Sequence, residues 1–251
     1  MTKRVAARRS TGWPKPRPAI SSPFAARPEK GYPMDQGQER PYVPRPYAAS
    51  EDEARQMIRA YPFATVITCG QDTPEATQTP LFFETEDPGC RTLIGHIARI
   101  NPQAGELMAP GPVLAVFNGP SAYVSPSWYV EDEDVPTWIY RSVHLRGEIE
   151  PVDSSGMRAL MERIIALSES RIGGAWQLSR IPDADIARMM PRIIGFRIHL
   201  TALKGISKLE QTRSAANRAG VAAGLEAGEE IGKDLLVDLL RRPRNPECIG
   251  C

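Results

Sequence analysis

The chain has 251 residues, of which 31 are Lys or Arg and 30 are Asp or Glu, so its formal net charge is +1 at pH 7. A balance this close to zero gives no global attraction to nucleic acid or to anionic lipid. The sequence has no apolar stretch of the roughly 18–20 residues that span a bilayer, and its first residues lack the apolar core of a secretory signal. It therefore predicts a cytoplasmic protein with no membrane partner.

Residues 1–40 contain nine basic residues, three acidic residues and six prolines, with hardly any apolar periodicity. Such a composition cannot offset the entropy lost on ordering, which predicts a disordered, basic, Pro-rich tail. A solvated extension, with Met34 as an alternative start, is favoured over a nucleic-acid-binding arm.

A folded domain is predicted over residues 41–226. Ser50 and Glu53 have the spacing of a capping box, which predicts a helix that ends near Ala60. Short β-branched and apolar segments follow as predicted strands, around 61–68, 76–85, 91–98, 112–120, 142–152 and 193–205. Helical periodicity is expected over 154–167, 214–226 and 229–241, and residues 227–251 are assigned to a C-terminal helix and a flexible tail. Strands in such a series favour an antiparallel sheet or a small barrel.

Aromatic residues gather in the segment 118–150, which is too rich in Pro and Ser to be regular strand throughout. Trp128, Tyr129, Trp138 and Tyr140 lie there beside hydroxyl groups. Rings with polar edges suit a flat heteroaromatic cofactor, whereas the alternative is that they fill one end of a barrel.

The segment GHIARINP, residues 95–102, places His96 and Arg99 at the end of a predicted strand. If the strand ends near Ala98, Arg99 is free to bind an anion together with the amides of the turn that follows. The alternatives are a surface ion pair for Arg99 and a hydrogen-bonded polar group for His96. In the last predicted strand, His199 faces away from the apolar stripe and is expected to face solvent.

Six segments occur in an order and spacing that resemble the PaiB-like "FMN-binding negative transcriptional regulator" family, with YVSPSWY and VPTWIY as the most specific signature. They are YPFATVIT (61–68), G-x-x-x-P-x-A-T (70–77), LIGHIARINPQ (93–103), VLAVFNGPSAYVSPSWY (113–129), VPTWIYRSVHLRG (135–147) and IIGFRIHLTALKG with KLEQ (193–211). The resemblance covers roughly residues 41–225. It implies a mainly β fold with helices, an antiparallel split β-barrel of the FMN-binding type, that forms a homodimer with its cofactor at the subunit interface. It also implies that the strand holding Arg99 contacts the flavin phosphate.

The sequence departs from this family at positions that donate hydrogen bonds. The family usually has Thr-His at Thr77-Gln78, Asn at Ile139, and Gly-Lys-Trp-Lys-Leu-Ser-Gln-Asn at residues 205–212, of which Lys208 and Gln211 remain. These changes remove donors that an anionic flavin would use. Thr77, Gln78, Lys208 and Gln211 are still predicted to lie near the cofactor.

Proteins similar to this family, the piperazate synthases, bind haem instead and form an N–N bond. The resemblance therefore leaves FMN and haem b open as cofactors, with either His96 or His144 as the axial ligand if haem is bound. We predict that both histidines line the site as catalytic residues, that Arg99 binds an anionic group, and that the four aromatic residues form a wall.

The predicted function is the binding of FMN or haem at a dimer interface, with redox or haem-dependent chemistry on a small molecule. The alternatives are piperazate synthase-like N–N bond formation and a cofactor-sensing transcriptional regulator, so whether the protein is an enzyme is left open. DNA is the lesser prediction as a partner, because the sequence shows no helix-turn-helix pattern with basic recognition positions.

Overall fold

The computed structural model describes residues 41–70, 73–131, 135–229 and 232–241. The predicted tail 1–40 and the last residues, 242–251, lie outside these ranges. The helices are α1 (Glu51–Ala60), α2 (Ala104–Leu107), α3 (Met157–Arg171), α4 (Asp183–Met189), α5 (Ala215–Ala227) and α6 (Lys233–Arg241), with short 3-10 turns η1 (Arg45–Tyr47), η2 (Pro126–Trp128), η3 (Leu178–Arg180) and η4 (Met190–Arg192). The strands are β1 (Ala48–Ala49), β2 (Phe63–Cys69), β3 (Pro74–Pro80), β4 (Phe82–Phe83), β5 (Thr92–Ala98), β6 (Pro112–Val124), β7 (Thr137–Val152) and β8 (Ile193–Lys208).

The first helix begins at the predicted capping box. The Glu53 amide donates to Ser50 Oγ over 3.2 Å, and the Ser50 amide donates to Glu53 Oε2 over 2.8 Å. These two bonds satisfy backbone donors that have no partner inside the helix. The prediction of this helix and of its end near Ala60 is confirmed.

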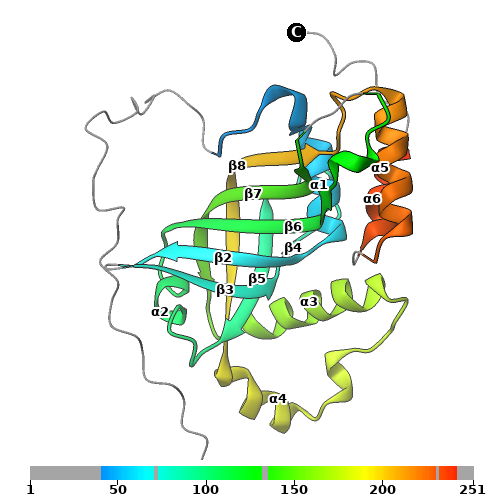
Figure 1. Ribbon diagram of the computed structural model, residues 1–251. Coiled ribbons are helices and arrows are strands. Elements are labelled where there is room, and N and C mark those ends of the chain that lie inside the picture. The colour runs from blue at the N-terminus through cyan, green and yellow to red at the C-terminus, as the bar shows by residue number, and fades with distance from the viewer. Residues whose placement is uncertain (1–40, 71–72, 132–134, 230–231, 242–251) are drawn as a thin grey trace, which may run out of the picture. The chain divides into compact units, whose positions relative to one another are not determined.

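The eight strands form one antiparallel sheet in the order β3-β2-β6-β7-β8-β5-β4, and β1 pairs with β8. The sheet curls until β3 lies against β5 (Figure 1). There, Thr79 Oγ1 donates to the His96 carbonyl over 2.7 Å. We call this junction of β3 and β5 the seam. It makes the fold an antiparallel barrel that is split at the seam and flanked by helices, as predicted.

The barrel encloses the main hydrophobic core, to which α1 contributes. Alternate residues of β8 face this core, and the prediction that His199 lies on the opposite, exposed face is confirmed. Helix α3 covers the outer side of β5 and β8, while α5 and α6 pack against the ends of β6 and β7. The largest fully buried side chains of the main core belong to Met57, Ile58, Leu81, Leu93, Leu107, Phe117, Leu145, Phe196 and Ile198.

The segment between residues 118 and 150 is more regular than predicted. Strand β6 continues to Val124 and β7 begins at Thr137, so the prediction of irregular structure is wrong for residues 121–124 and 137–141. The pairing shifts by one residue between Asn118 and Ser121. Such a bulge accommodates Pro120, which has no amide hydrogen for the ladder.

The described helices include none that is both long enough and apolar enough to cross a membrane.

Candidate functional site

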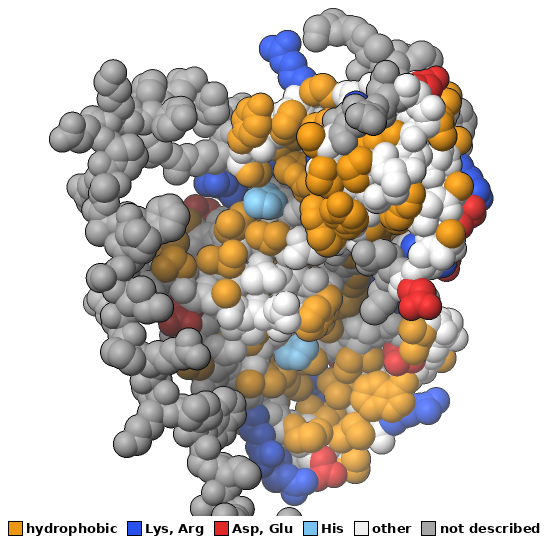
Figure 2. Space-filling view, in the orientation of Figure 1, with side chains coloured by type: hydrophobic (Ala, Val, Ile, Leu, Met, Phe, Trp, Pro, Cys, Tyr) orange, Lys and Arg blue, Asp and Glu red, His pale blue; other side chains and the backbone are white. Residues whose placement is uncertain are grey.

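The outward-facing residues of β3, β2, β6 and β7 form a surface that we call the open face. Figure 1 shows these strands in front, with no described helix across them, and Figure 2 shows hydrophobic side chains among polar ones over the same strands. Paired residues of an antiparallel sheet project to the same side. The register therefore aligns one row across the open face and onto β8: Gln78, Thr65, Val116, His144 and Lys204.

Burial shows which way this row points. Val143 and Leu145, the neighbours of His144 in β7, are buried in the barrel core. Side chains alternate along a strand, so His144 projects to the outside, where it is half-buried. Two of the predicted site residues, Gln78 of β3 and His144 of β7, thus share one row although they are far apart in sequence.

The same face of β7 carries the predicted aromatic pair Trp138 and Tyr140. Trp138 is 54% exposed, and its ring meets Tyr123 of β6 edge-to-face at a centroid distance of 6.1 Å. Tyr140 is half-buried between its register partners Ser121 and Lys208. The open face therefore ends in exposed aromatic rings on the side of η2.

Trp128 and Tyr129 lie elsewhere. Both pack against the cluster that α5 and α6 form with Ala122 and Ile139, which are on the side of the sheet opposite Trp138 and Tyr140. The Tyr129 hydroxyl donates to Glu210 Oε2 over 3.0 Å. The structure thus does not bring the four aromatic residues together in one wall.

The electrostatics of His144 favour the neutral imidazole. Burial lowers its pKa, and the positive charge of Arg146 lowers it further. A neutral imidazole has one donor and one acceptor nitrogen, so His144 can offer either to a ligand on the open face.

His96 lies on β5, next to the region that α3 covers. Its Nδ1 is buried without a hydrogen-bond partner, and burial lowers its pKa. His96 pairs with Gly195 of β8, and Gly195 pairs on its other side with Val152 of β7. His144 of β7 instead pairs with Lys204 of β8. At about 3.3 Å per residue, roughly 25 Å of β7 separates the two positions, so the two histidines do not form a pair across β7 and β8.

Arg99 follows β5 and binds the chain itself. Its Nε donates to the Pro191 carbonyl over 2.7 Å and its Nη2 to the Ile193 carbonyl over 3.3 Å. Its Nη1 lies 3.5 Å from Met108 Sδ. The guanidinium thereby joins the end of β5 to the start of β8.

The remaining predicted residues have local partners. Thr77 Oγ1 accepts a 2.9 Å hydrogen bond from Asn101, which links β3 to the turn after Arg99. Lys208 Nζ donates to Thr137 Oγ1. Gln211 Nε2 donates to the Ser207 carbonyl over 2.6 Å, a bond that closes the turn after β8.

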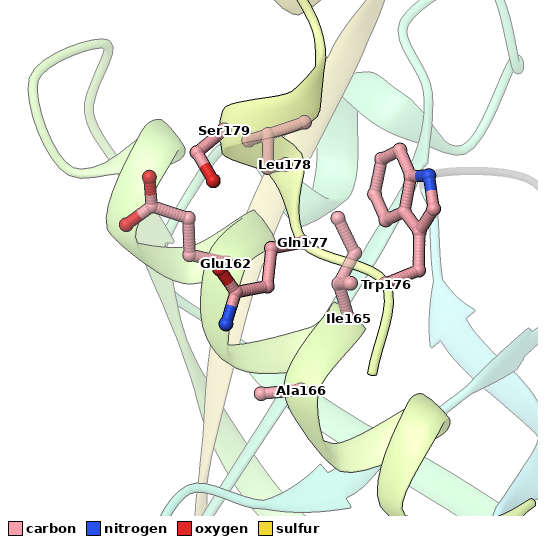
Figure 3. A pocket seen from close by; sticks show the side chains of 7 residues that line it. All are labelled: Glu162, Ile165, Ala166, Trp176, Gln177, Leu178 and Ser179. Atoms are coloured by element: carbon pink, nitrogen blue, oxygen red, sulfur yellow. The ribbon is translucent and has the colours of Figure 1, made fainter. Parts of the chain in front are cut away.

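A cavity of about 260 Å³ lies between α3 and η3, away from the predicted site residues. Figure 3 shows Trp176 on one side of it and Glu162 and Gln177 on the other. None of the predicted cofactor residues lines it. The open face, rather than this cavity, therefore gathers the predicted donors.

Three residues of the row, Thr65, Val116 and Lys204, were not predicted as site residues. The alternation that places Ile198 and Leu200 inward does not extend to Lys204, because the pairing of β8 with β7 shifts by one residue at Thr201. Nothing in the sequence marked Thr65 as a site residue, because its only signal was the strand propensity of a β-branched residue. The open face thus combines β-branched residues with amide, imidazole and cationic groups, which suits a planar ligand with polar edges and an anionic end.

Metal ligation by protein side chains alone has no basis in the described part of the chain. No three His, Cys, Asp or Glu side chains there lie close enough together to hold a metal ion.

Residues 41–202 match the family described as "Putative FMN-binding domain". The chain is 29% identical over 181 residues to "Protease synthase and sporulation protein PAI 2" of Bacillus subtilis, a match that covers 72% of this chain and 86% of that protein. A conserved hypothetical protein of Mycobacterium tuberculosis matches with a TM-score of 0.48 at 14% identity, covering 69% of this chain and 94% of that one. The FAD and haem binding protein of Mycobacterium smegmatis matches with a TM-score of 0.46 at 16% identity, covering 63% and 71%.

Proposed function

Because this chain belongs to the family described as "Putative FMN-binding domain", we propose that its open face binds FMN and supports redox chemistry on a small molecule. The observation that carries the proposal is the cross-strand row, in which Gln78, Thr65 and His144 face the same side of the sheet. A flavin ring needs hydrogen bonds at its polar edges and apolar contact on its faces, and this row offers both.

Three residues of the row have tasks in this proposal. Gln78 and His144 would hold polar edges of the ring, and Val116, which lies between β2 and β7, would contact a face. Flavin, when bound, supplies hydride and single-electron transfer. The imidazole of His144, kept neutral by burial and by Arg146, can hold a proton on one nitrogen and accept a hydrogen bond on the other.

A second copy of the chain is part of the proposal. Phe63 on the open face is 60% exposed, and the outward-facing Ile67, Leu114 and Val116 are only half-buried. Apolar side chains gathered on one face are typical of an interface. A homodimer formed through the open face would cover them, exclude water from the cofactor and complete the site.

The test is the absorption spectrum of the purified full chain, followed by acid release and identification of any chromophore. We expect flavin absorption and released FMN, and we expect the His144→Ala variant to retain less FMN than the wild type. His199→Ala is the matched control, because His199 lies on β8, outside the row of paired residues, and contacts Glu150. Wild-type protein that stays colourless and does not bind added FMN would contradict the proposal.

Haem is a second candidate, favoured by one observation. A half-buried imidazole whose lowered pKa favours the neutral form, as His144 presents on the open face, is the form of histidine that ligates haem iron. N–N bond formation of the piperazate synthase kind belongs to this alternative. A Soret band that shifts on reduction and is lost in His144→Ala would replace FMN by haem as the cofactor.

A further inference from the structure

The cavity between α3 and η3 is formed where the chain turns back after α3 (Figure 3). Gly173 has a φ of +68°, a left-handed conformation that commonly ends a helix. The Trp176 amide then donates to Glu169 Oε2 over 2.9 Å, which fixes the returning segment to α3. The cavity is thus a feature of the fold, and none of the residues in the row on the open face lines it.

One side of the cavity is apolar. Ile165 of α3 and Leu178 of η3 line it and are only half-buried, and Trp176 is 36% exposed. Figure 3 shows Ile165 and the indole of Trp176 on the same side of the cavity. Apolar surface that stays in contact with water favours a ligand that covers it.

The opposite side is polar, and its groups have acceptors to spare. Glu162 Oε1 accepts a 3.0 Å hydrogen bond from Arg158 Nε, while Glu162 Oε2 has no partner within the described part of the chain. The side chains of Gln177 and Ser179 likewise form no hydrogen bond with the described residues. A carboxylate, an amide and a hydroxyl oxygen are therefore available to a donor on a ligand.

The charge beside these acceptors is negative. Arg158 is shared between two carboxylates, because its Nη1 also binds Asp183 Oδ1 over 2.8 Å. One guanidinium between two carboxylates leaves an excess of one negative charge. Among the described residues, no Lys or Arg lines the cavity itself, and Arg180 at the end of η3 lies outside the lining. A cation is therefore attracted to the polar side and an anion is repelled.

We propose that this cavity binds a small primary ammonium ion with an apolar body. An ammonium has three donors and no acceptor, which matches the free oxygens of Glu162, Gln177 and Ser179. The apolar body lies against Ile165 and the indole of Trp176. The volume of about 260 Å³ is below the roughly 300–1,000 Å³ of most ligand pockets, so the ligand is small. The proposal does not depend on flavin binding at the open face.

The experiment compares three probes of similar size that differ in charge: phenylethylammonium, phenylethanol and phenylpropanoate. Binding of each to the full chain is measured by isothermal titration calorimetry. The cation is expected to bind at least about tenfold more tightly than the alcohol, the usual effect of a charge-assisted hydrogen bond. The anion is expected to bind most weakly of the three.

Three variants assign the binding to this cavity. Glu162→Gln removes the charge and keeps the shape, so it should abolish the preference for the cation and leave phenylethanol binding unchanged. Trp176→Ala removes part of the apolar side and should weaken the binding of both the cation and the alcohol. Glu86→Gln is the matched control, because Glu86 also pairs with an arginine of α3, Arg163, but does not line the cavity. Thermal unfolding checks that each variant folds.

The outcomes separate this site from the open face. A wild type that binds none of the probes, binds all three equally or prefers the anion overturns the inference. A preference for the cation that persists in Glu162→Gln also overturns it, because the ammonium then binds elsewhere on the chain. None of these measurements involves flavin, so their failure leaves the proposed function intact, and a chain that binds no flavin leaves this test unchanged.

Discussion

The indole of Trp128 packs closely against α5, where two glycines leave room for it. A Cβ atom added to Gly224 would lie 2.5 Å from Trp128 Cγ, far inside van der Waals contact. Gly220 of the same helix accommodates the backbone of Trp128. These glycines explain why an aromatic residue with the appearance of a cofactor contact instead packs against its own chain.

We expect Gly224→Ala to lower the free energy of unfolding by about 1–3 kcal/mol, because the added methyl group overpacks this contact. The midpoint of urea unfolding measures the change. Gly105→Ala in α2 is the matched control: its added Cβ would have no neighbour within 4 Å, and its stability should be unchanged or higher. Equal losses in both variants would refute the role given to Trp128.

Gln103 links three parts of the barrel through one buried amide. Its side chain is almost fully buried, and its Nε2 donates to the carbonyls of Val66 and Glu75 over 3.1 Å each and to Thr68 Oγ1 over 2.9 Å. The turn after β5 is thus joined to both β2 and β3.

Gln103→Ala should cost about 1–3 kcal/mol of stability, since it leaves these acceptors buried without their donor. Chemical unfolding followed by circular dichroism measures the cost. Gln177→Ala, which removes an exposed amide at the rim of the cavity in Figure 3, should change the stability by much less. A Gln103→Ala variant as stable as the wild type would contradict this.

Helices α5 and α6 hold the segment after η2 in place. Asn217 Oδ1 accepts from the amides of Val130 and Glu131 over 2.8 and 3.1 Å, and Ser214 caps the helix at the Asn217 amide. The predicted domain boundary at residue 226 separates α5 from α6, whereas the two helices share one hydrophobic cluster with β6 and β7. The conformation of the loop therefore depends on the C-terminal helices.

Asn217→Ala should speed hydrogen exchange at the Val130 and Glu131 amides and cost about 1–2 kcal/mol, because both donors lose their acceptor. Mass spectrometry of exchanged peptides measures the first effect. Asn217→Asp keeps an acceptor of the same shape and should preserve the protection. Unchanged exchange in Asn217→Ala would show that this contact does not order the segment.

Regular elements with local signals could be predicted from the sequence. The capping box at Ser50 and the alternation that ends at Leu200 depend only on neighbouring residues, and both are present in the structure. The extension of β6 beyond Pro120 could not be predicted in this way. Proline argues against a strand interior, and only the pairing with β7 shows that it occupies a bulge.

The candidate site was only partly predictable, for a reason that concerns the whole barrel. A row such as Gln78, Thr65 and His144 depends on the register between strands that are distant in sequence, and one sequence does not specify that register. The bulge at Thr201 then reverses which residues of β8 face outward, so Lys204 could not be placed by alternation.

Buried neutral histidines make the stability of the folded chain depend on pH. Burial lowers the pKa of His96 and of His144, so as the pH falls below the ordinary histidine value of about 6.5 the unfolded chain takes up more protons than the folded one. We expect the free energy of unfolding to fall between about pH 7.5 and 5.5, above the titration of carboxylates.

The pH series is measured by urea unfolding of the wild type and of His96→Asn, in which the dependence should be shallower. Ser179→Ala keeps every histidine and should behave as the wild type does. Stability that stays constant or rises over this range on acidification would contradict the assignment.

The proposed homodimer makes a prediction about mass in solution. Phe63→Glu places a charge among the apolar side chains of the open face and should convert a dimer into a monomer, as measured by light scattering after gel filtration. Ile172→Glu, at an exposed residue after α3, is the matched control and should leave the mass unchanged. A wild-type protein that is monomeric at every concentration would rule out this interface.

The seam has a further consequence, which concerns polymerisation. β3 ends the hydrogen-bonded order of the sheet, and such a strand is a template on which another chain can grow. Here Pro74 and Pro80 stand at its two ends, and the buried Thr79 donates to the His96 carbonyl along the edge that faces β5. An incoming strand would have to displace β5 and would meet positions without amide hydrogens. The contacts that join the barrel therefore also keep neighbouring molecules from adding to it strand by strand.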